Sequence, residues 1–483
     1  MRSHTLRRFA LMAAVPLGLA AVAGTGLASP ALAAQAGPGT AAVIDGAQTF
    51  QRISGFGASE AFGQAQTVMN APAAVQQQAL GLLYGPRGAG LTILRNEIPA
   101  EVGNTIEPTA PASPSSPPAY VPLSATDDDI GQLWFAQQIR QEYGVRQVFA
   151  DAWSAPAFMK TNDATDFGGT LCGVPGASCA SGDWRQAYAD YLVQYARDYA
   201  QAGIPLEYIG FENEANLAPS YAGMVMTPDQ TANFASVLGP TLARSGLRTK
   251  QECCATEGWD YAAQYAAAIE SDPAAYRWVS LFTSHGYTEA PASPLPGWTK
   301  PVWETEWSTF QTWDPAWDDG TTASGFAWAQ NIYTGLTSAN LGAFLYWWGS
   351  STPAENGDNE GLILINGDTV TASSRLWAFA NYSRFVRPGA VRIGATSPDP
   401  SVELTAFRNV NGTVAIVALN TATTTQSMTF SVGHAGLPGF GVAVPYLTDN
   451  SSDTAAQAPV PVRSGSFTAA LPARSLVTYE IRG

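Results

Sequence analysis

Residues 206–214 read LEYIGFENE, a short apolar run that ends in two glutamates around an asparagine. Tyr, Ile and Phe dominate this run, which predicts a strand over Leu206–Glu212. The preceding segment, Trp184–Gln201, repeats large apolar residues at the three- and four-residue spacing of an amphipathic helix. These residues are Tyr188, Tyr191, Leu192, Tyr195 and Tyr199. A helix followed by a strand with polar residues at its end is typical of a parallel α/β sheet.

The same alternation continues on both sides of this segment. Further helical patterns cover Ile130–Tyr143 and Asp260–Glu270. Eight strand-like runs over ~300 residues predict a (β/α)8 TIM barrel, whose active site lies at the C-terminal ends of the strands. The eight runs are Ile53–Gly57, Leu91–Asn96, Gln147–Ala152, Leu206–Glu212, Thr249–Cys254, Trp278–Thr283, Val302–Glu306 and Leu341–Trp348.

The last hundred residues have a different sequence pattern, with strand-like runs and without helical periodicity. Short alternating runs separated by turn residues predict a β-sandwich there. A β-like segment near Val43–Phe50 is expected to join this sandwich. The predicted division is therefore 34–50 as linker and N-terminal strand, 51–383 as the barrel and 384–483 as the sandwich. The runs are Val402–Phe407, Val414–Leu419, Gln426–Val432, Gly441–Leu447 and Ser475–Ile481.

Composition narrows the class of protein. The 483 residues are 46% hydrophobic and only 13% charged, and the formal net charge is −15. Such a chain can bury a large core, and its acidic surface repels nucleic acid and anionic membranes. Only three histidines occur, so a zinc site built on several histidines is excluded. The acids Asp127, Asp128 and Asp129 are interpreted as an N-terminal helix cap rather than a calcium site, and no metal or cofactor is expected.

The first 33 residues are interpreted as a secretory signal peptide. Arg7 and Arg8 precede an apolar stretch, and ALA at 31–33 has the small residues of a cleavage site. The alternative is a membrane anchor, but Pro16 and several glycines interrupt the stretch. We therefore expect a secreted, extracellular protein.

Four cysteines are present: Cys172, Cys179, Cys253 and Cys254. An even number in an exported chain suggests disulfides. Cys172 and Cys179 bracket a short loop in which a local bridge is natural. The adjacent pair would then close a strained ring, and the alternative is two buried thiols. All three connectivities remain open at this stage.

Acidic and aromatic residues gather at three predicted strand ends. These are GFENE at 210–214, WETEW at 303–307 and LYWW at 345–348. Glycoside hydrolysis needs one protonated and one ionised carboxyl group facing each other, and aromatic faces stack on sugar rings. The alternative is that a glutamate at a strand end only caps a helix or faces solvent.

The sequence resembles glycoside hydrolase family 30, a family of retaining glycosidases with a TIM barrel and a side β-sandwich. The resemblance covers nearly everything after residue 40, and its last motif is typical of xylan-active members. The matching stretches are RISGFG at 52–57, LR at 94–95, WSAP at 153–156, MK at 159–160, NE at 213–214, HGY at 285–287, VWETE at 302–306, WW at 347–348 and YSRFVRPG at 382–389.

This resemblance implies roles for individual residues. Glu214 is implied as the acid/base and Glu306 as the nucleophile. Arg95 is expected to help keep the nucleophile ionised, because a nearby cation lowers the pKa of a carboxyl group. Asn213 is implied as the partner of the sugar 2-hydroxyl. The remaining substrate-binding candidates are His285 and Tyr287 as contacts of the nucleophile and sugar, and Trp153, Trp347 and Trp348 as apolar walls or, alternatively, core.

The chain also departs from the family pattern. Ala215 follows Glu214 where proline is usual, and two extra acids, Glu212 and Glu304, precede the pair. Strand periodicity predicts that each extra acid shares a face with the glutamate two residues on. A like charge there would raise the pKa of the catalytic group.

Specificity is expected to differ from that of the glucuronoxylan-specific members. Those enzymes carry an arginine soon after the Trp-Trp pair, whereas here GSST follows at 349–352 and the next arginine is Arg375. The cysteine pair and the stretch GASEAF at 57–62 are more similar to the fungal-type branch. Gln64 and Gln66 stand where that branch can carry a uronate-binding arginine.

The resulting prediction is a secreted, monomeric, retaining β-glycosidase that hydrolyses β-1,4-xylan or a related plant β-glycan by double displacement. The alternatives are a β-1,6-glucanase, a glucosylceramidase-like glycosidase, and a non-catalytic carbohydrate-binding wall protein. The retention of both Glu214 and Glu306 argues against the last of these.

Overall fold

The computed structural model describes residues 41–482 except 102, 124–128, 354–358 and 438. The predicted signal peptide, residues 34–40 of the predicted linker, Asp127 and Asp128 therefore lie outside the described residues. Within the described part of the chain, no helix has the length and apolar character needed to cross a membrane.

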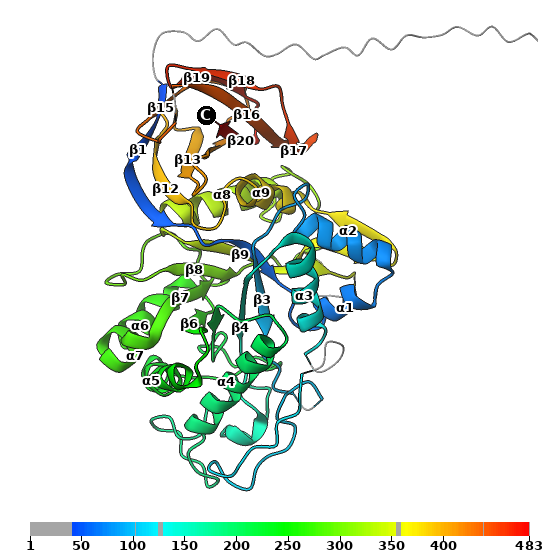
Figure 1. Ribbon diagram of the computed structural model, residues 1–483, viewed down its shortest axis with the longest axis vertical. Helices are drawn as coiled ribbons and strands as arrows, with labels where there is room; N and C mark the ends of the chain where they lie inside the picture. Colours follow the sequence, from blue (N-terminus) through cyan, green and yellow to red (C-terminus); the bar gives the residue numbers. More distant parts are fainter. Residues whose placement is uncertain (1–40, 102, 124–128, 354–358, 438, 483) are drawn as a thin grey trace, which may run out of the picture. The chain divides into compact units, whose positions relative to one another are not determined.

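Eight parallel strands form a closed barrel, which confirms the predicted fold. The sheet order runs from β2 to β9, and β9 pairs with both β8 and β2, so the sheet closes on itself. Figure 1 labels β3, β4, β6, β7, β8 and β9 of this barrel, with helices beside them. The strands are β2 (Gly55–Ser59), β3 (Ile93–Glu97), β4 (Gln147–Asp151), β5 (Tyr208–Ile209), β6 (Lys250–Thr256), β7 (Val279–His285), β8 (Val302–Glu306) and β9 (Ala343–Ser351).

The helices follow the strands in alternation, with one exception. Residues 286–301 connect β7 to β8 without a helix. The three helices predicted from periodicity are α3, α4 and α6. The helices of the described residues are α1 (Gln64–Asn70), α2 (Ala73–Leu83), α3 (Gln132–Tyr143), α4 (Arg185–Gln201), α5 (Pro228–Ser245), α6 (Trp259–Ser271), α7 (Pro273–Trp278), α8 (Gly325–Thr337) and α9 (Ser374–Ser383), with a short 3-10 turn at Ala157–Met159.

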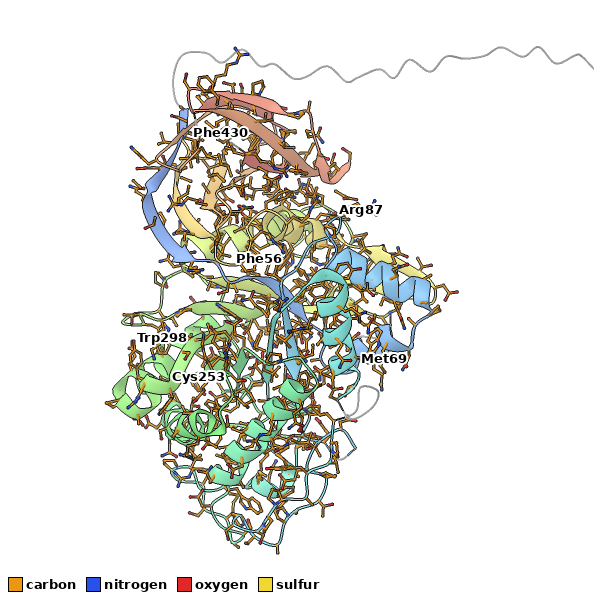
Figure 2. The ribbon with its side chains drawn as sticks, viewed as in Figure 1. Phe56, Met69, Arg87, Cys253, Trp298 and Phe430 are labelled. Atoms are coloured by element: carbon orange, nitrogen blue, oxygen red, sulfur yellow. A yellow bond between two sulfur atoms is a disulfide. The ribbon has the colours of Figure 1, made fainter. Side chains whose placement is uncertain are left out.

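The C-terminal β-domain includes the N-terminal strand, as predicted. β1 (Ala41–Arg52) pairs in parallel with β15 and antiparallel with β12, and a β16–β20 pairing closes the sheet into a ring. In its core the rings of Phe430 and Phe467 stack on each other, and Tyr479 packs against both at a tilt; Figure 2 labels Phe430. The strands are β12 (Val391–Thr396), β13 (Val402–Arg408), β14 (Val414–Asn420), β15 (Gln426–Gly433), β16 (Phe440–Asp449), β17 (Ser452–Ala456), β18 (Val460–Arg463), β19 (Ser466–Leu471) and β20 (Ser475–Arg482).

β10 (Gly361–Asn366) and β11 (Thr369–Ala372) extend the barrel sheet beside β9. Direct contacts join the barrel to the C-terminal β-domain. Helix α9 packs against β16, β17 and β20. Thr478 donates a hydrogen bond of 2.6 Å to the carbonyl of Asn381, and Arg474 pairs with Asp318 at 2.7 Å. These bonds attach the C-terminal domain to the barrel.

The interior of the barrel changes from apolar to polar along the strands. Two residues beyond the apolar layer, β3, β4 and β7 present Arg95, Asp151 and Thr283, because side chains on one face of a strand recur every second residue. The polar layer therefore lies at the C-terminal end of the barrel, where the fold places its active sites. The apolar layer consists of Ile93, Phe149, Tyr208, Leu281, Trp303, Ala343 and Leu345.

Candidate active site

The two predicted catalytic glutamates meet at the C-terminal end of the barrel. Glu306 is the last residue of β8, whereas Glu214 lies beyond β5 in a left-handed conformation with φ of 48°. The amide of Glu214 is held by the carbonyl of Ala255 at 2.7 Å. One carboxylate oxygen of Glu214, one of Glu306 and one ring nitrogen of His285 all lie within 4.8 Å of one another.

Arg95 connects Glu306 to two other polar residues. Its guanidinium donates to Oε2 of Glu306, to Oδ1 of Asn213 at 2.5 Å and to Oδ2 of Asp151 at 2.7 Å. Its face lies 4.5 Å from the ring centre of Trp153. The planar guanidinium of Arg95 can donate several hydrogen bonds in fixed directions. It therefore holds Asn213 and Glu306 in fixed relative positions.

His285 and Tyr287 complete the surroundings of the two carboxyl groups. Nδ1 of His285 is 2.9 Å from Oε1 of Glu214, and its Nε2 is 3.6 Å from Oε2 of Glu306. The hydroxyl of Tyr287 donates to Oε1 of Glu306 at 2.9 Å. Both side chains therefore contact the carboxyl group of Glu306, and their predicted contact with a sugar stays a prediction.

The hydrogen-bond partners distinguish the two carboxyl groups. Glu306 accepts bonds from a cation and from a phenol, and both donors stabilise its ionised form. Glu214 faces an imidazole that is neutral, because burial lowers the pKa of His285 to about 4. Burial and the nearby Glu257 raise the pKa of Glu214 to about 8. Burial also raises the pKa of Glu306, and Arg95 opposes this shift without cancelling it.

The three tryptophans form one aromatic group. The rings of Trp347 and Trp348 stack with centroids 5.0 Å apart, and Trp153 lies 5.8 Å from Trp347. Each is more than nine-tenths buried, with Phe62 packed against them. The structure therefore brings all three together, but it leaves little of their surface open.

The two extra acids do not accompany the catalytic pair, so the prediction that they share its faces is wrong. Glu212 accepts a bond of 2.8 Å from Thr231 of α5, and Glu304 accepts one of 2.7 Å from the indole of Trp259. A register shift in the β7–β8 pairing separates Glu304 from Glu306, and β5 ends before Glu212, so the strict alternation fails at both places.

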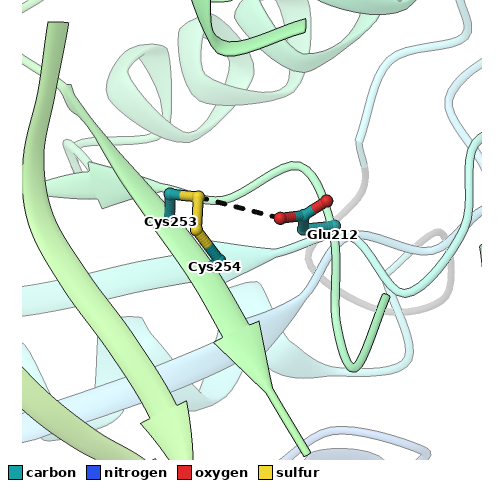
Figure 3. Close-up of side chains that lie close together, drawn as sticks. All are labelled: Glu212, Cys253 and Cys254. Carbon is teal, nitrogen blue, oxygen red and sulfur yellow. Dashed lines mark hydrogen bonds between the residues drawn. A yellow bond between two sulfur atoms is a disulfide. The ribbon is translucent and has the colours of Figure 1, made fainter. Parts of the chain in front are cut away.

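Both cysteine pairs are disulfides, Cys172–Cys179 and Cys253–Cys254. Figure 3 shows Glu212 beside the second bridge, with Oε1 3.7 Å from Sγ of Cys253. A disulfide sulfur carries no proton, so Glu212 must be the donor of this contact. Burial raises the pKa of Glu212, which favours the protonated form of its carboxyl group.

Among the residues that the structure describes, two groups of side chains have the composition of a metal site. One is Glu214, His285 and Glu306, and the other is Glu212 with the Cys253–Cys254 bridge. The guanidinium of Arg95 already provides the positive charge beside the first group. In the second, the sulfurs are joined to each other and offer no thiolate to a metal.

Sequence reasoning did not identify four residues around the site. The hydroxyl of Tyr221 lies 3.5 Å from Oε2 of Glu214, and Glu257 faces Glu214 from the loop after β6. Asp151 supports Arg95, and Glu252 lies next to Asp151. Asp151 and Glu252 lie in strands that the sequence predicts, so their positions could have marked them as site candidates. Tyr221 lies in an irregular loop, where no sequence pattern marks it.

Comparison with known proteins defines the class of this barrel. Residues 124–301 match the glycosyl hydrolase family 30 TIM-barrel domain, and residues 389–479 match the family 30 β-sandwich domain. The catalytic domain of GH30 xylanase C from Talaromyces cellulolyticus is 39% identical, with a TM-score of 0.85; the match covers 92% of this chain and all of that chain. The chain belongs to glycoside hydrolase family 30, a family of O-glycosyl hydrolases.

Curated relatives within the family have different substrates. A glucuronoxylanase XynC of Bacillus subtilis is 26% identical, and the match covers 69% of this chain and 74% of the relative. The endo-1,6-beta-D-glucanase BGN16.3 of Trichoderma harzianum is 24% identical over 77% of this chain and 78% of the relative. Family membership therefore leaves the glycan to be decided by the site.

Proposed function

We propose that this glycosidase hydrolyses β-1,4-xylan with retention of anomeric configuration. The observation that carries the mechanism is the short distance between the carboxyl groups: one oxygen of Glu214 and one of Glu306 lie within 4.8 Å. Retaining enzymes hold their carboxyl groups ~5–5.5 Å apart, whereas inverting enzymes need ~6.5–9.5 Å to admit a water molecule.

The proposed reaction has two steps. Glu306 attacks the anomeric carbon while Glu214 transfers its proton to the leaving oxygen, so the glycosidic bond breaks and a glycosyl ester forms. Glu214, now ionised, then removes a proton from water, whose oxygen attacks the anomeric carbon and releases Glu306. Asn213, oriented by Arg95, is the proposed partner of the sugar 2-hydroxyl.

The choice of xylan rests on the similarity to the Talaromyces xylanase C and on the xylanase-like motif at 382–389. The alternatives, a β-1,6-glucanase and a glucosylceramidase-like enzyme, have relatives at lower identity. The test is product analysis on arabinoxylan, glucuronoxylan and β-1,6-glucan, with proton NMR of the first anomer released. Cleavage of the xylans to β-anomers supports the proposal. Cleavage of β-1,6-glucan alone, or release of the α-anomer first, contradicts it.

We also propose that the protein is exported and acts as a monomer. The basic residues, apolar stretch and small residues of 1–33 support export. Amino-terminal sequencing of the protein from culture medium should give a chain that starts near residue 34, and light scattering should give the mass of one chain. Retention of the intact N-terminus in the cell, or the mass of a dimer, would contradict these expectations.

A further inference from the structure

We propose that Glu252 is a positioning residue that shares one proton with Asp151. This pair helps to hold both Glu214 and Glu306 in place. Through Arg95 the pair orients Glu306, and through a chain of hydrogen bonds it orients the backbone of Glu214. The inference deepens the proposed function, because it rests on the roles assigned there to the two glutamates.

The two carboxyl groups meet above Gly210. A Cβ at Gly210 would lie 1.7 Å from Oε1 of Glu252 and 2.0 Å from Oδ1 of Asp151, so these oxygens are no farther apart than the sum of the two distances. Both side chains are fully buried, and neither of these two oxygens has another donor within the described part of the chain. Two buried carboxylates at this distance cannot both be ionised, so a proton lies between them.

The neighbours of the pair indicate which carboxyl group carries the proton. Oδ2 of Asp151 accepts a bond of 2.7 Å from Arg95, a cation that favours the ionised form. Oε2 of Glu252 instead accepts a bond of 2.6 Å from the neutral hydroxyl of Thr283. Burial, and then the charge of Asp151, raise the pKa of Glu252. Glu252 is therefore the donor and Asp151 the acceptor.

The hydrogen bonds continue from Glu252 to the acid/base. The hydroxyl of Thr283 accepts a bond of 2.9 Å from the amide of Ala255 while it donates to Glu252. The carbonyl of Ala255 in turn accepts the amide of Glu214 at 2.7 Å. The buried side chain of Glu252 thus connects to Glu306 through Asp151 and Arg95, and to the backbone of Glu214 through Thr283 and Ala255.

Within the described part of the chain, few other charged groups act on the pair. Arg95 of β3 and Asp151 of β4 act on Glu252 directly, and Thr283 of β7 is neutral. His285 and Tyr188 lie near Asp151, and both are uncharged at neutral pH because burial lowers the pKa of His285 and raises that of Tyr188.

The test compares two substitutions at one position. Glu252→Gln keeps a donor for Asp151 and an acceptor for Thr283, whereas Glu252→Leu keeps neither. We expect Glu252→Leu to lose kcat by about a hundredfold, as misplaced catalytic groups do, and Glu252→Gln to keep at least about a tenth of kcat. Gln251→Leu is the matched control, because Gln251 is a buried polar neighbour on the same strand whose side chain makes no hydrogen bond to the pair within the described residues.

The pH profile separates positioning from simple destabilisation. Arg95 lowers the pKa of Glu306, so a loosened Arg95 should move the acidic limb of kcat/KM to higher pH in Glu252→Leu and leave it in place in Glu252→Gln. Equal losses of kcat in both variants, an unmoved limb in Glu252→Leu, or an equal loss in Gln251→Leu would each overturn the proposal.

An infrared measurement tests the shared proton without any substrate. The carbonyl band of a buried protonated carboxyl group should lose intensity in Glu252→Gln relative to the wild type and to Gln251→Leu. No loss of intensity in Glu252→Gln would overturn the proposal. This test does not need Glu252→Leu, so it applies even if that variant does not fold. Inactivity of the wild-type enzyme on xylan would instead contradict the proposed substrate and leave this result valid.

Discussion

The imidazole of His285 lies between the two proposed catalytic carboxyl groups: its Nδ1 lies 2.9 Å from Glu214, and its Nε2 faces Glu306 at 3.6 Å. The ring is neutral because burial lowers its pKa to about 4. The tautomer that fits accepts the proton of Glu214 at Nδ1 and directs Nε2–H toward Glu306. His285 therefore favours a protonated acid and an ionised nucleophile in the same site.

Glu306→Ala should lower kcat on the order of 10⁴-fold or more, because it removes the proposed nucleophile. Azide should restore part of the cleavage of an activated aryl glycoside, since a small anion can occupy the space that the side chain leaves. The expected product is the α-glycosyl azide, identified by NMR.

Glu304→Gln is the control for this experiment. Glu304 contacts Trp259 rather than the substrate pocket, so this variant should keep far more activity than Glu306→Ala. If Glu304→Gln were inactive and Glu306→Ala active, the assignment of the nucleophile would be wrong.

Glu257→Gln should shift the alkaline limb of the pH–activity profile to lower pH. Glu257 is a like charge that, after burial, raises the pKa of Glu214 to about 8. The glutamine keeps the acceptor for Asn216, which donates to Glu257 at 2.9 Å. Removal of the charge lowers the pKa of the acid, so the limb should move down by roughly half a unit. Asp260→Asn, on the same side of the barrel, should leave the limb in place; a shift of equal size there would refute the assignment.

Protein stability should decrease as pH rises above about 4.5. The carboxyl group of Glu60 is fully buried beside Ser350, and burial raises its pKa from 4.5 to about 8. The folded protein therefore retains a proton that the unfolded chain releases. This contribution to the free energy of unfolding is complete below pH 4.5 and is lost as pH rises through 8.

Glu60→Gln tests this explanation by thermal unfolding at pH 5 and pH 8.5. The neutral amide cannot titrate, so the fall in Tm between the two pH values should shrink by at least about 2 °C. Glu289→Gln, at an exposed position, should keep the slope of the wild type. The same slope in Glu60→Gln and the wild type would disprove the role of Glu60.

Glucuronic acid branches should have little effect on the rate. Arg375, the first arginine after the Trp347–Trp348 pair, is buried and donates to the carbonyls of Asp314, Ala323 and Gly361. Residues 349–352 offer only neutral hydrogen bonds of about 1 kcal/mol each. Rates on glucuronoxylan and on unbranched xylooligosaccharides should agree within about tenfold. A hundredfold loss without the uronate would show that an arginine does reach the pocket.

Phe310→Ala should weaken substrate binding with little change in kcat. Phe310 is 64% exposed, and its ring stacks on Tyr287 at 5.5 Å. An exposed aromatic face beside the nucleophile can stack on a sugar, a contact worth about 1 kcal/mol, or roughly a fivefold rise in KM. Phe440→Ala, which removes a similarly exposed ring from the C-terminal domain, should not change KM. Equal KM values in both variants would exclude Phe310 from binding.

The sequence by itself determined the class of fold and the location of the chemistry. The periodicity of a strand or helix is set by residues close together in the chain, so it can be read from the sequence. The predicted strand Val302–Glu306 and the predicted helix Trp184–Gln201 therefore agree with β8 and α4 within a residue or two. The position of Glu306 at the end of β8, and of Asn213 and Glu214 in the segment that follows β5, was readable for the same reason.

Only the tertiary structure decided which side chains meet. A register shift between β7 and β8 sends Glu304 and Glu306 to different partners, and a period counted along one strand cannot show this. The meeting of Asp151 with Glu252 depends on the close approach of different strands over Gly210. Such contacts arise from the pairing and inward curvature of neighbouring barrel strands, which bring together residues far apart in the chain whose contact leaves no local pattern in the sequence.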